Sequence, residues 1–206
     1  MPKSLKKLTI GLTGGIGAGK SSALELFARS GAKTVSLDAL AHELSAKGRP
    51  VHRSMVRAFG RSILNSQGEI DRRALGKKVF SSRPLLKKLE RATHPLIRKE
   101  MRRRVSGSSR RVVVVDVPLL FEGGLHEDFD VTVLVSAKRE TRIARVKRRD
   151  GLSRTEVLRR IRAQMPERKK RAAADVVIDN DGTIARLGRS VREYQDAFEL
   201  IAGGRR

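Results

Sequence analysis

Short apolar runs alternate with helical patterns along this chain of 206 residues. A continuous apolar run is typical of a strand that is buried on both faces of a sheet. Such runs predict strands at 8–13, 33–37, 112–117, 131–135 and 176–178. Between them, apolar residues recur every three or four positions, as on one face of a helix. Repeated strand–helix units predict an α/β fold with a parallel sheet and right-handed crossovers.

The strand pattern stops between about residues 48 and 107. Helical patterns cover 51–59 and 72–80, and a third begins at Pro84. We expect His94-Pro95 to interrupt this third helix, because proline lacks an N–H donor and restricts the residue before it. The whole stretch predicts a helical insertion within a single domain.

Two strongly basic helical segments lie between the last two strands, within about residues 138–172. Ser153 follows the turn that joins them, and Glu156 completes a capping-box pattern that starts the second helix. Two such helices can close over a bound nucleotide as a lid. The alternative is an ordinary solvated helical hairpin, which suits most of these arginines because a lid needs only two or three at the phosphates.

Residues 14–21, Gly-Gly-Ile-Gly-Ala-Gly-Lys-Ser, have the spacing of a Walker A phosphate-binding loop. Glycines let the backbone wrap closely around a polyphosphate with its N–H groups turned inward. Lys20 would meet the β- and γ-phosphates, and the Ser21 hydroxyl would help to hold Mg²⁺. The helix expected at 21–29 adds its N-terminal N–H groups and its dipole. The alternative is a glycine-rich turn that binds nothing, but the strand before the loop and the helix after it favour a nucleotide site.

Acidic residues stand at or just past the ends of the expected strands, where ligands of open parallel sheets bind. Asp38 is either the group that accepts the proton of an attacking hydroxyl or a helix N-cap. Asp116 is either a carboxylate near Mg²⁺ or a buried structural acid. Glu122 is a third acid of this kind, and His94 in the insertion either binds a substrate or is an interior histidine.

The composition limits both compartment and partners. Cysteine is absent, which suits a reducing, cytoplasmic compartment, and the first apolar run is too short for a signal peptide or a membrane span. Forty-six Lys and Arg against 22 acidic residues give a net charge of +24, which suits polyanionic partners. Much of this charge, including Arg102, Arg103 and Arg104, is expected to be exposed surface. With one Tyr, six Phe and no Trp for base stacking, we expect no specific nucleic acid partner.

Several motifs together resemble the dephospho-CoA kinase family over nearly the whole chain. They are residues 11–21, Gly68-Glu69-Ile70-Asp71-Arg72, His94-Pro95-Leu96-Ile97-Arg98, Val117-Pro118-Leu119-Leu120-Phe121-Glu122, Arg149-Asp150, Arg160-Ile161, Gln164, Lys170, Ala174-Asp175 and Val177-Ile178-Asp179-Asn180. The resemblance implies a three-layer P-loop NTPase fold, in which 48–107 binds the CoA substrate and 138–172 is a lid. It also implies transfer of the γ-phosphoryl group of ATP, with Mg²⁺, to the ribose 3′-hydroxyl of dephospho-CoA. We expect the enzyme to be a monomer.

The resemblance further implies roles for individual residues. The catalytic residues would be Asp38, Lys20 and Arg145. The ATP-binding residues would be Gly15, Gly17, Ala18, Gly19, Lys20, Ser21, Ser22 and Asn180. The residues that bind the acceptor would be Asp38, His42, His94, Leu119, Phe121 and Glu122. Mg²⁺ would be held by Ser21 and Asp116.

The chain also departs from the family at three notable positions. Ser36 stands where the first Asp of an Asp-Ala-Asp stretch is usual, and Arg142 replaces a common Gln. His42 stands where an Arg is expected, and a protonated imidazole there can still meet a phosphate.

Two other functions stay open. One is another small-molecule P-loop kinase, such as one for nucleoside monophosphates, and the His94-Pro95 insertion argues against it. The other is a non-catalytic nucleic-acid-binding protein, and a Walker A loop followed by a strand-end acid argues against that. A GTPase is less favoured still, because the sequence has no Asn-Lys-x-Asp stretch to read guanine.

Overall fold

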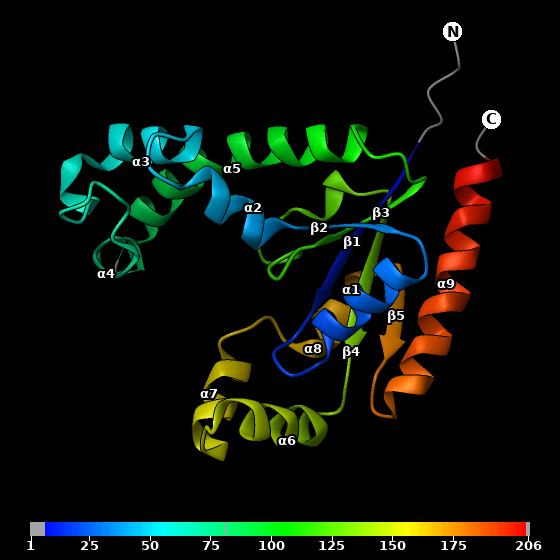
Figure 1. The fold of residues 1–206 in the computed structure, drawn as a ribbon. Coiled ribbons are helices and arrows are strands. Elements are labelled where there is room, and N and C mark those ends of the chain that lie inside the picture. Colours follow the sequence, from blue (N-terminus) through cyan, green and yellow to red (C-terminus); the bar gives the residue numbers. More distant parts are fainter. Residues whose placement is uncertain (1–6, 81, 205–206) are drawn as a thin grey trace, which may run out of the picture. The chain divides into compact units, whose positions relative to one another are not determined.

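The computed structural model describes residues 7–80 and 82–204, and within them β1 is the central strand of a five-stranded sheet (Figure 1). The order is β2-β3-β1-β4-β5. The strands are β1 (Leu8–Gly14), β2 (Lys33–Ser36), β3 (Val112–Asp116), β4 (Val131–Ser136) and β5 (Val176–Asp179). β1 pairs in parallel with β3 and with β4, and β4 pairs in parallel with β5. The strand predictions are confirmed to within one or two residues at each end.

The register of β1 and β3 brings the phosphate loop and a strand-end acid to the same edge of the sheet. Leu12 lies opposite Asp116, so the loop that follows Gly14 begins beside the end of β3. Gly11 gives β1 the space to pass under a ring, because a Cβ there would lie 2.8 Å from Phe129. The sheet thus places residues that are about 100 positions apart in the sequence at one edge.

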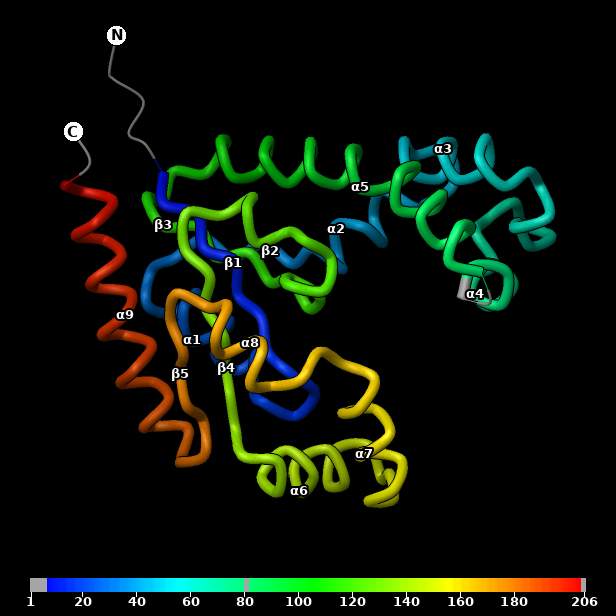
Figure 2. The backbone as a smooth tube through the Cα atoms, turned by 180° about the vertical axis from the view of Figure 1, so that it is seen from behind, coloured from blue at the N-terminus to red at the C-terminus, as the bar shows by residue number. Residues whose placement is uncertain are grey.

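Helices cover both faces of this sheet, as the predicted three-layer fold requires. α1 (Lys20–Arg29) and α9 (Ile184–Gly204) pack together on one face, where the rings of Phe27 and Phe198 stack with centroids 6.4 Å apart. α8 (Glu167–Ala173) lies against β4 on the opposite face (Figures 1 and 2). Because the sheet is covered on both sides, its central strands are apolar throughout.

The expected lid region forms α6 (Arg139–Asp150), α7 (Arg154–Arg162) and α8. The capping box at Ser153 and Glu156 is confirmed, since each residue bonds to the backbone N–H of the other. The second basic segment is divided into α7 and α8 rather than forming one helix. Pro166 is the N-cap of α8, and proline disfavours a helical conformation in the residue before it, which explains the break.

Residues Ser36–Gly107 form a second compact unit, distinct from the one formed by residues 1–35 and 108–206. Its helices are α2 (Leu37–Leu44), α3 (Pro50–Phe59), α4 (Arg72–Phe80) and α5 (Arg83–Ser106), with a 3₁₀ turn at Arg61–Ile63. α2, α3 and α4 each pack against α5. The unit contains the predicted insertion at 48–107 and adds α2 to it.

Two predictions for this unit are wrong. α5 runs without a break through Pro95, although the missing N–H costs a helix about 3 kcal/mol. Pro95 is exposed, while Thr93 and Met101 bury the opposite side of the helix, and this packing outweighs the loss. Arg104 is not simply exposed: it donates to Glu43 at 2.6 Å and to Glu100 at 3.2 Å.

None of the helices within residues 7–80 and 82–204 combines the length and apolar character needed to cross a membrane.

Candidate active site

The phosphate loop leaves β1 at Gly14 and enters α1 at Lys20. Gly17 and Gly19 have φ values of +77° and +94°, which side chains with a Cβ rarely adopt. In the described structure, α1 has no side chain that caps its N-terminus and no acid in its first turn. The N–H groups at the start of a helix need partners. The first turn, which includes Ser21 and Ser22, therefore presents donors suited to an anion.

Lys20 and Asp116 are brought together by the sheet. The Lys20 ammonium donates to Asp116 Oδ1, and both side chains are half-buried. Lys20 lies at the start of α1 and Asp116 at the end of β3. The ion pair therefore joins the helix that follows β1 to the strand that pairs with β1. This geometry places a cation and a carboxylate next to the helix terminus that suits an anion.

The Ala18 carbonyl is held from outside the loop. Asn180 Nδ2 donates to it at 2.8 Å, and Arg145 Nη1 lies 3.4 Å from it. Asn180 is only 5 % exposed, and its backbone N–H donates to Ser136 at 2.7 Å. Gly19 leaves the space for this contact, because a Cβ there would collide with the Asn180 amide. Asn180, predicted to bind ATP, and Arg145, predicted to be catalytic, therefore both adjoin the loop, and their contact with ATP itself stays a prediction.

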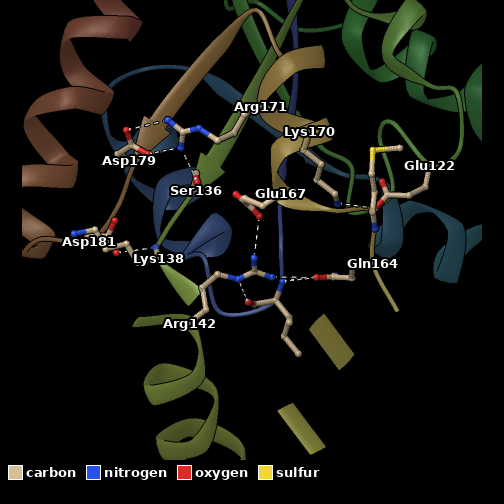
Figure 3. Close-up of polar contacts among 12 residues, drawn as sticks. Glu122, Ser136, Lys138, Arg142, Gln164, Glu167, Lys170, Arg171, Asp179 and Asp181 are labelled. Carbon is tan, nitrogen blue, oxygen red and sulfur yellow. Dashed lines mark hydrogen bonds and ion pairs between the residues drawn. The ribbon is translucent and has the colours of Figure 1, made fainter. Parts of the chain in front are cut away.

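Arg142, for which the sequence predicts no role, lies against the same loop (Figure 3). The residue is 4 % exposed, and its side chain reaches Ile16, Gln164 and Glu167. Burial lowers the pKa of the Arg142 guanidinium, and the Glu167 carboxylate offsets part of that effect. The signal in the sequence was the replacement of the family's common Gln by Arg, but nothing in the sequence showed which groups it would meet.

Glu122 makes a second connection between the sheet edge and the lid region (Figure 3). Its Oε1 lies 2.6 Å from Nζ of Lys170 in α8 and accepts the N–H of Met165 at 3.2 Å. Burial raises the pKa of Glu122, but the bonds from Lys170 and from backbone N–H groups outweigh it and hold the pKa below its usual value. Glu122 is thus engaged by the protein, and its predicted contact with the acceptor stays a prediction.

The other predicted acceptor contacts after β3 differ in exposure. Leu119 is 56 % exposed and presents apolar surface. Phe121 is buried, with its ring centroid 5.9 Å from that of His126. Their contact with a substrate is untested, and Phe121 has a packing role as well.

Three predicted site residues belong to the second unit. Asp38 is exposed in the first turn of α2, and the alternative that it caps this helix is wrong, because Ser36 is the N-cap and accepts the Ala39 N–H at 3.2 Å. His42 Nδ1 lies 2.7 Å from Nη2 of Arg72, so a guanidinium accompanies the imidazole. His94 is half-buried in α5.

The residues near the phosphate loop fit a Mg²⁺ ion carried by a nucleotide. Among the described residues, no three His, Cys, Asp or Glu side chains are grouped so that they could hold a metal alone. Mg²⁺ usually keeps waters and binds through one or two carboxylates together with substrate phosphates. A hydroxyl at Ser21 and a carboxylate at Asp116, beside a terminus that suits phosphate, match that donor set.

The sequence and the fold of this chain are similar to those of known proteins. The family model described as dephospho-CoA kinase matches residues 8–186. Dephospho-CoA kinase of Geobacter sulfurreducens is 44% identical over 187 residues, covering 89% of this chain and 95% of that protein. A crystal structure from Thermus thermophilus superposes with a TM-score of 0.80 at 38% identity, covering 93% of this chain and 97% of that one.

A more distant structure, dephospho-CoA kinase from Campylobacter jejuni, has a TM-score of 0.59 at 24% identity, covering 94% of this chain and 98% of that one, and supports the fold alone. The family model covers most of the chain, including both the phosphate loop and the second unit. The chain therefore belongs to the dephospho-CoA kinase family.

Proposed function

We propose that this protein transfers the γ-phosphoryl group of ATP to the ribose 3′-hydroxyl of dephospho-CoA and so forms coenzyme A. Family membership supplies the reaction. The structural observation that carries the proposal is the uncapped N-terminus of α1 behind a glycine loop, with Lys20 beside it. It provides backbone donors and a cation for the phosphates of ATP.

The donor side of the reaction uses groups that lie together in the first unit. The transition state of phosphoryl transfer is loose, so the protein mainly positions groups and neutralises charge. Lys20 binds the β- and γ-phosphates of ATP. These phosphates compete with the Asp116 carboxylate for the Lys20 ammonium. Ser21 and Asp116 would hold Mg²⁺, which when bound would neutralise charge on the phosphate oxygens.

The acceptor side uses Asp38, His42 and His94, together with residues that follow β3. Asp38 accepts a hydrogen bond from the 3′-hydroxyl and takes its proton as the new O–P bond forms and ADP leaves. His42, with Arg72 beside it, binds anionic groups of the acceptor, and His94 binds the acceptor as well. Leu119, Phe121 and Glu122 contribute the remaining contacts to the acceptor.

The lid helices complete the site over ATP. Arg145 contacts the transferring phosphoryl group, where charge spreads over the equatorial oxygens. The protein acts as a monomer in the cytoplasm and has no specific nucleic acid partner. Any binding to RNA or DNA is electrostatic and fades as salt rises.

A product assay with purified protein tests this proposal. Coenzyme A should form only when ATP, Mg²⁺ and dephospho-CoA are all present, with the new phosphate on the 3′ position by ³¹P NMR. Lys20→Ala should abolish the reaction, while Lys147→Ala, an exposed residue of α6, should leave it unchanged. Equal activity with AMP as the acceptor would favour a nucleoside monophosphate kinase instead.

A further inference from the structure

Two alternate carbonyls of the phosphate loop are held by side chains on its outer side. Arg142 Nε donates to the Ile16 carbonyl at 2.9 Å, and Asn180 donates to the Ala18 carbonyl at 2.8 Å. The Ile16 N–H is held as well, since it donates to Gln164 Oε1 at 2.9 Å. Both backbone polar groups of Ile16 are therefore fixed by side chains that lie more than 120 positions further along the chain.

Holding a carbonyl also fixes the N–H that follows it. In a planar trans peptide, the C=O of one residue and the N–H of the next point in opposite directions. A guanidinium that draws the Ile16 carbonyl outward therefore turns the Gly17 N–H away from Arg142, to the other side of the loop. Asn180 does the same for the Gly19 N–H through the Ala18 carbonyl. Alternating N–H groups presented on one side are what an anion-binding backbone requires.

The packing around Arg142 explains two glycines of the loop. A Cβ on Gly15 would collide with the Arg142 guanidinium. A Cβ on Gly17 would lie 2.7 Å from the Arg142 carbonyl. These glycines therefore admit Arg142 as well as a phosphate.

Arg142 is unsuited to touching the nucleotide itself. It is 4 % exposed, and besides Ile16 it donates to Glu167 at 2.8 Å and approaches Gln164 at 3.4 Å. Its donors are directed to protein groups, and Glu167, the first residue of α8, neutralises its charge (Figure 3).

We propose that Arg142 is a positioning residue, which with Gln164 sets the orientation of the Ile16 and Gly17 peptides and so prepares the loop for ATP. The proposal rests on the ATP-binding part of the proposed function, and on the phosphoryl transfer to dephospho-CoA only for its kinetic readout. This chain has Arg at position 142, where Gln is common in the family, and the buried guanidinium needs the Glu167 carboxylate as a counter-ion. Because Gln carries no charge, Arg142→Gln should make Glu167 dispensable for ATP binding.

Direct binding of ATP to each variant tests this independently of the acceptor. Loss of a charge-assisted hydrogen bond predicts about a ten-fold or larger rise in the Kd for ATP of Arg142→Ala. Arg142→Gln keeps a donor and should stay within about three-fold of wild type. The matched control is Arg148→Ala, on the exposed side of the same helix, which should bind ATP as wild type does.

Kinetics and a second pair of variants separate positioning from mere stability. Arg142→Ala should raise KM for ATP and lower kcat, while KM for dephospho-CoA stays unchanged. Glu167→Leu should weaken ATP binding by itself, and Arg142→Gln with Glu167→Leu should restore it. If Arg142→Ala does not fold, Gln164→Leu, which frees the Ile16 N–H, should raise the Kd for ATP.

The outcomes are distinct. A lower melting temperature with an unchanged Kd for ATP in Arg142→Ala, or in Gln164→Leu if that variant replaces it, overturns the proposal and leaves Arg142 as a packing residue. Altered ATP binding in a protein that makes no coenzyme A supports the positioning role and contradicts the proposed function.

Discussion

Replacing Glu122 with Gln should destabilise the folded protein much more than replacing its partner Lys170 with Met. Lys170 is 1 % exposed, and its Nζ lies 2.6 Å from Glu122 Oε1, whereas the Glu122 side chain is 21 % exposed. Glu122→Gln leaves a buried ammonium without a counter-ion. Lys170→Met removes that buried charge and leaves a carboxylate that water reaches and that still accepts the Met165 N–H.

The magnitudes follow from this asymmetry. Breaking a buried pair by removing one partner costs about 3–5 kcal/mol, and the partial exposure of Glu122 places the cost of Glu122→Gln at about 3 kcal/mol. Replacing the buried charge by an apolar chain of similar volume is often nearly neutral, so Lys170→Met should cost about 1 kcal/mol or less. For a protein of this size, each kcal/mol shifts the melting temperature by about 2–4 °C, so Glu122→Gln should lower it by about 6–12 °C.

The difference between wild type and Glu122→Gln should also depend on pH. Burial raises the pKa of Glu122, but Lys170 and the backbone donors hold it below 4.5 in the folded protein. Because the pKa of Glu122 is lower in the folded state, its carboxylate stabilises the fold fully at pH values above its pKa in the unfolded chain. This stabilisation is lost as the pH falls through its pKa in the folded protein. The two proteins should therefore differ fully at pH 7 and converge in acid.

Melting curves followed by circular dichroism between about pH 3 and pH 8 measure both effects, since the helices lose their signal on unfolding. The double variant Glu122→Gln with Lys170→Met should melt like Lys170→Met alone. Equal losses from the two single variants at pH 7, or a difference that persists undiminished at the acid end, would refute the reasoning.

Two further predictions concern the second unit. Asp38→Asn should reduce turnover by about 10²–10⁴-fold without changing the melting temperature, because Ser36 caps α2. Single-turnover rates beside a melting curve check this, and an unchanged rate contradicts the catalytic role. Arg104→Ala should cost about 1 kcal/mol in urea unfolding, since it loses Glu43 and Glu100, whereas Arg91→Ala, exposed on the same helix, should cost less. Equal midpoints for the two variants would refute this.

The elements that the sequence predicted well are those whose signal is local. The apolar run at Val112–Val115 fixes a strand because β-branched side chains suit a sheet covered on both faces. The capping box at Ser153 and Glu156 depends on residues three positions apart. The phosphate loop has a local signal of both kinds, an apolar strand and a short motif, since a strand, its glycines and a helix follow one another within about 20 residues.

The predictions that failed depended on packing at long range. The sequence predicts an interruption of the helix at His94-Pro95 because the local cost of proline is real, but contacts of α5 with α2, α3 and α4 outweigh that cost. The cap of α2 was missed for a simpler reason. Ser36 and Asp38 are both good N-cap residues, and the choice between them depends on where β2 ends, which sequence patterns locate only to within a few residues.

The partners of the buried charges lay beyond any sequence pattern. Arg142 meets Ile16 across 126 positions, and Glu122 meets Lys170 from a different element of the fold. Buried charges need partners, so a buried Arg or Lys always indicates a tertiary arrangement, but its sequence neighbours do not reveal which one. In the phosphate loop the sequence supplies glycines that permit several peptide orientations. Residues from the lid region and from the end of β5 select among them, and the ability to hold a phosphate is therefore a property of the folded chain.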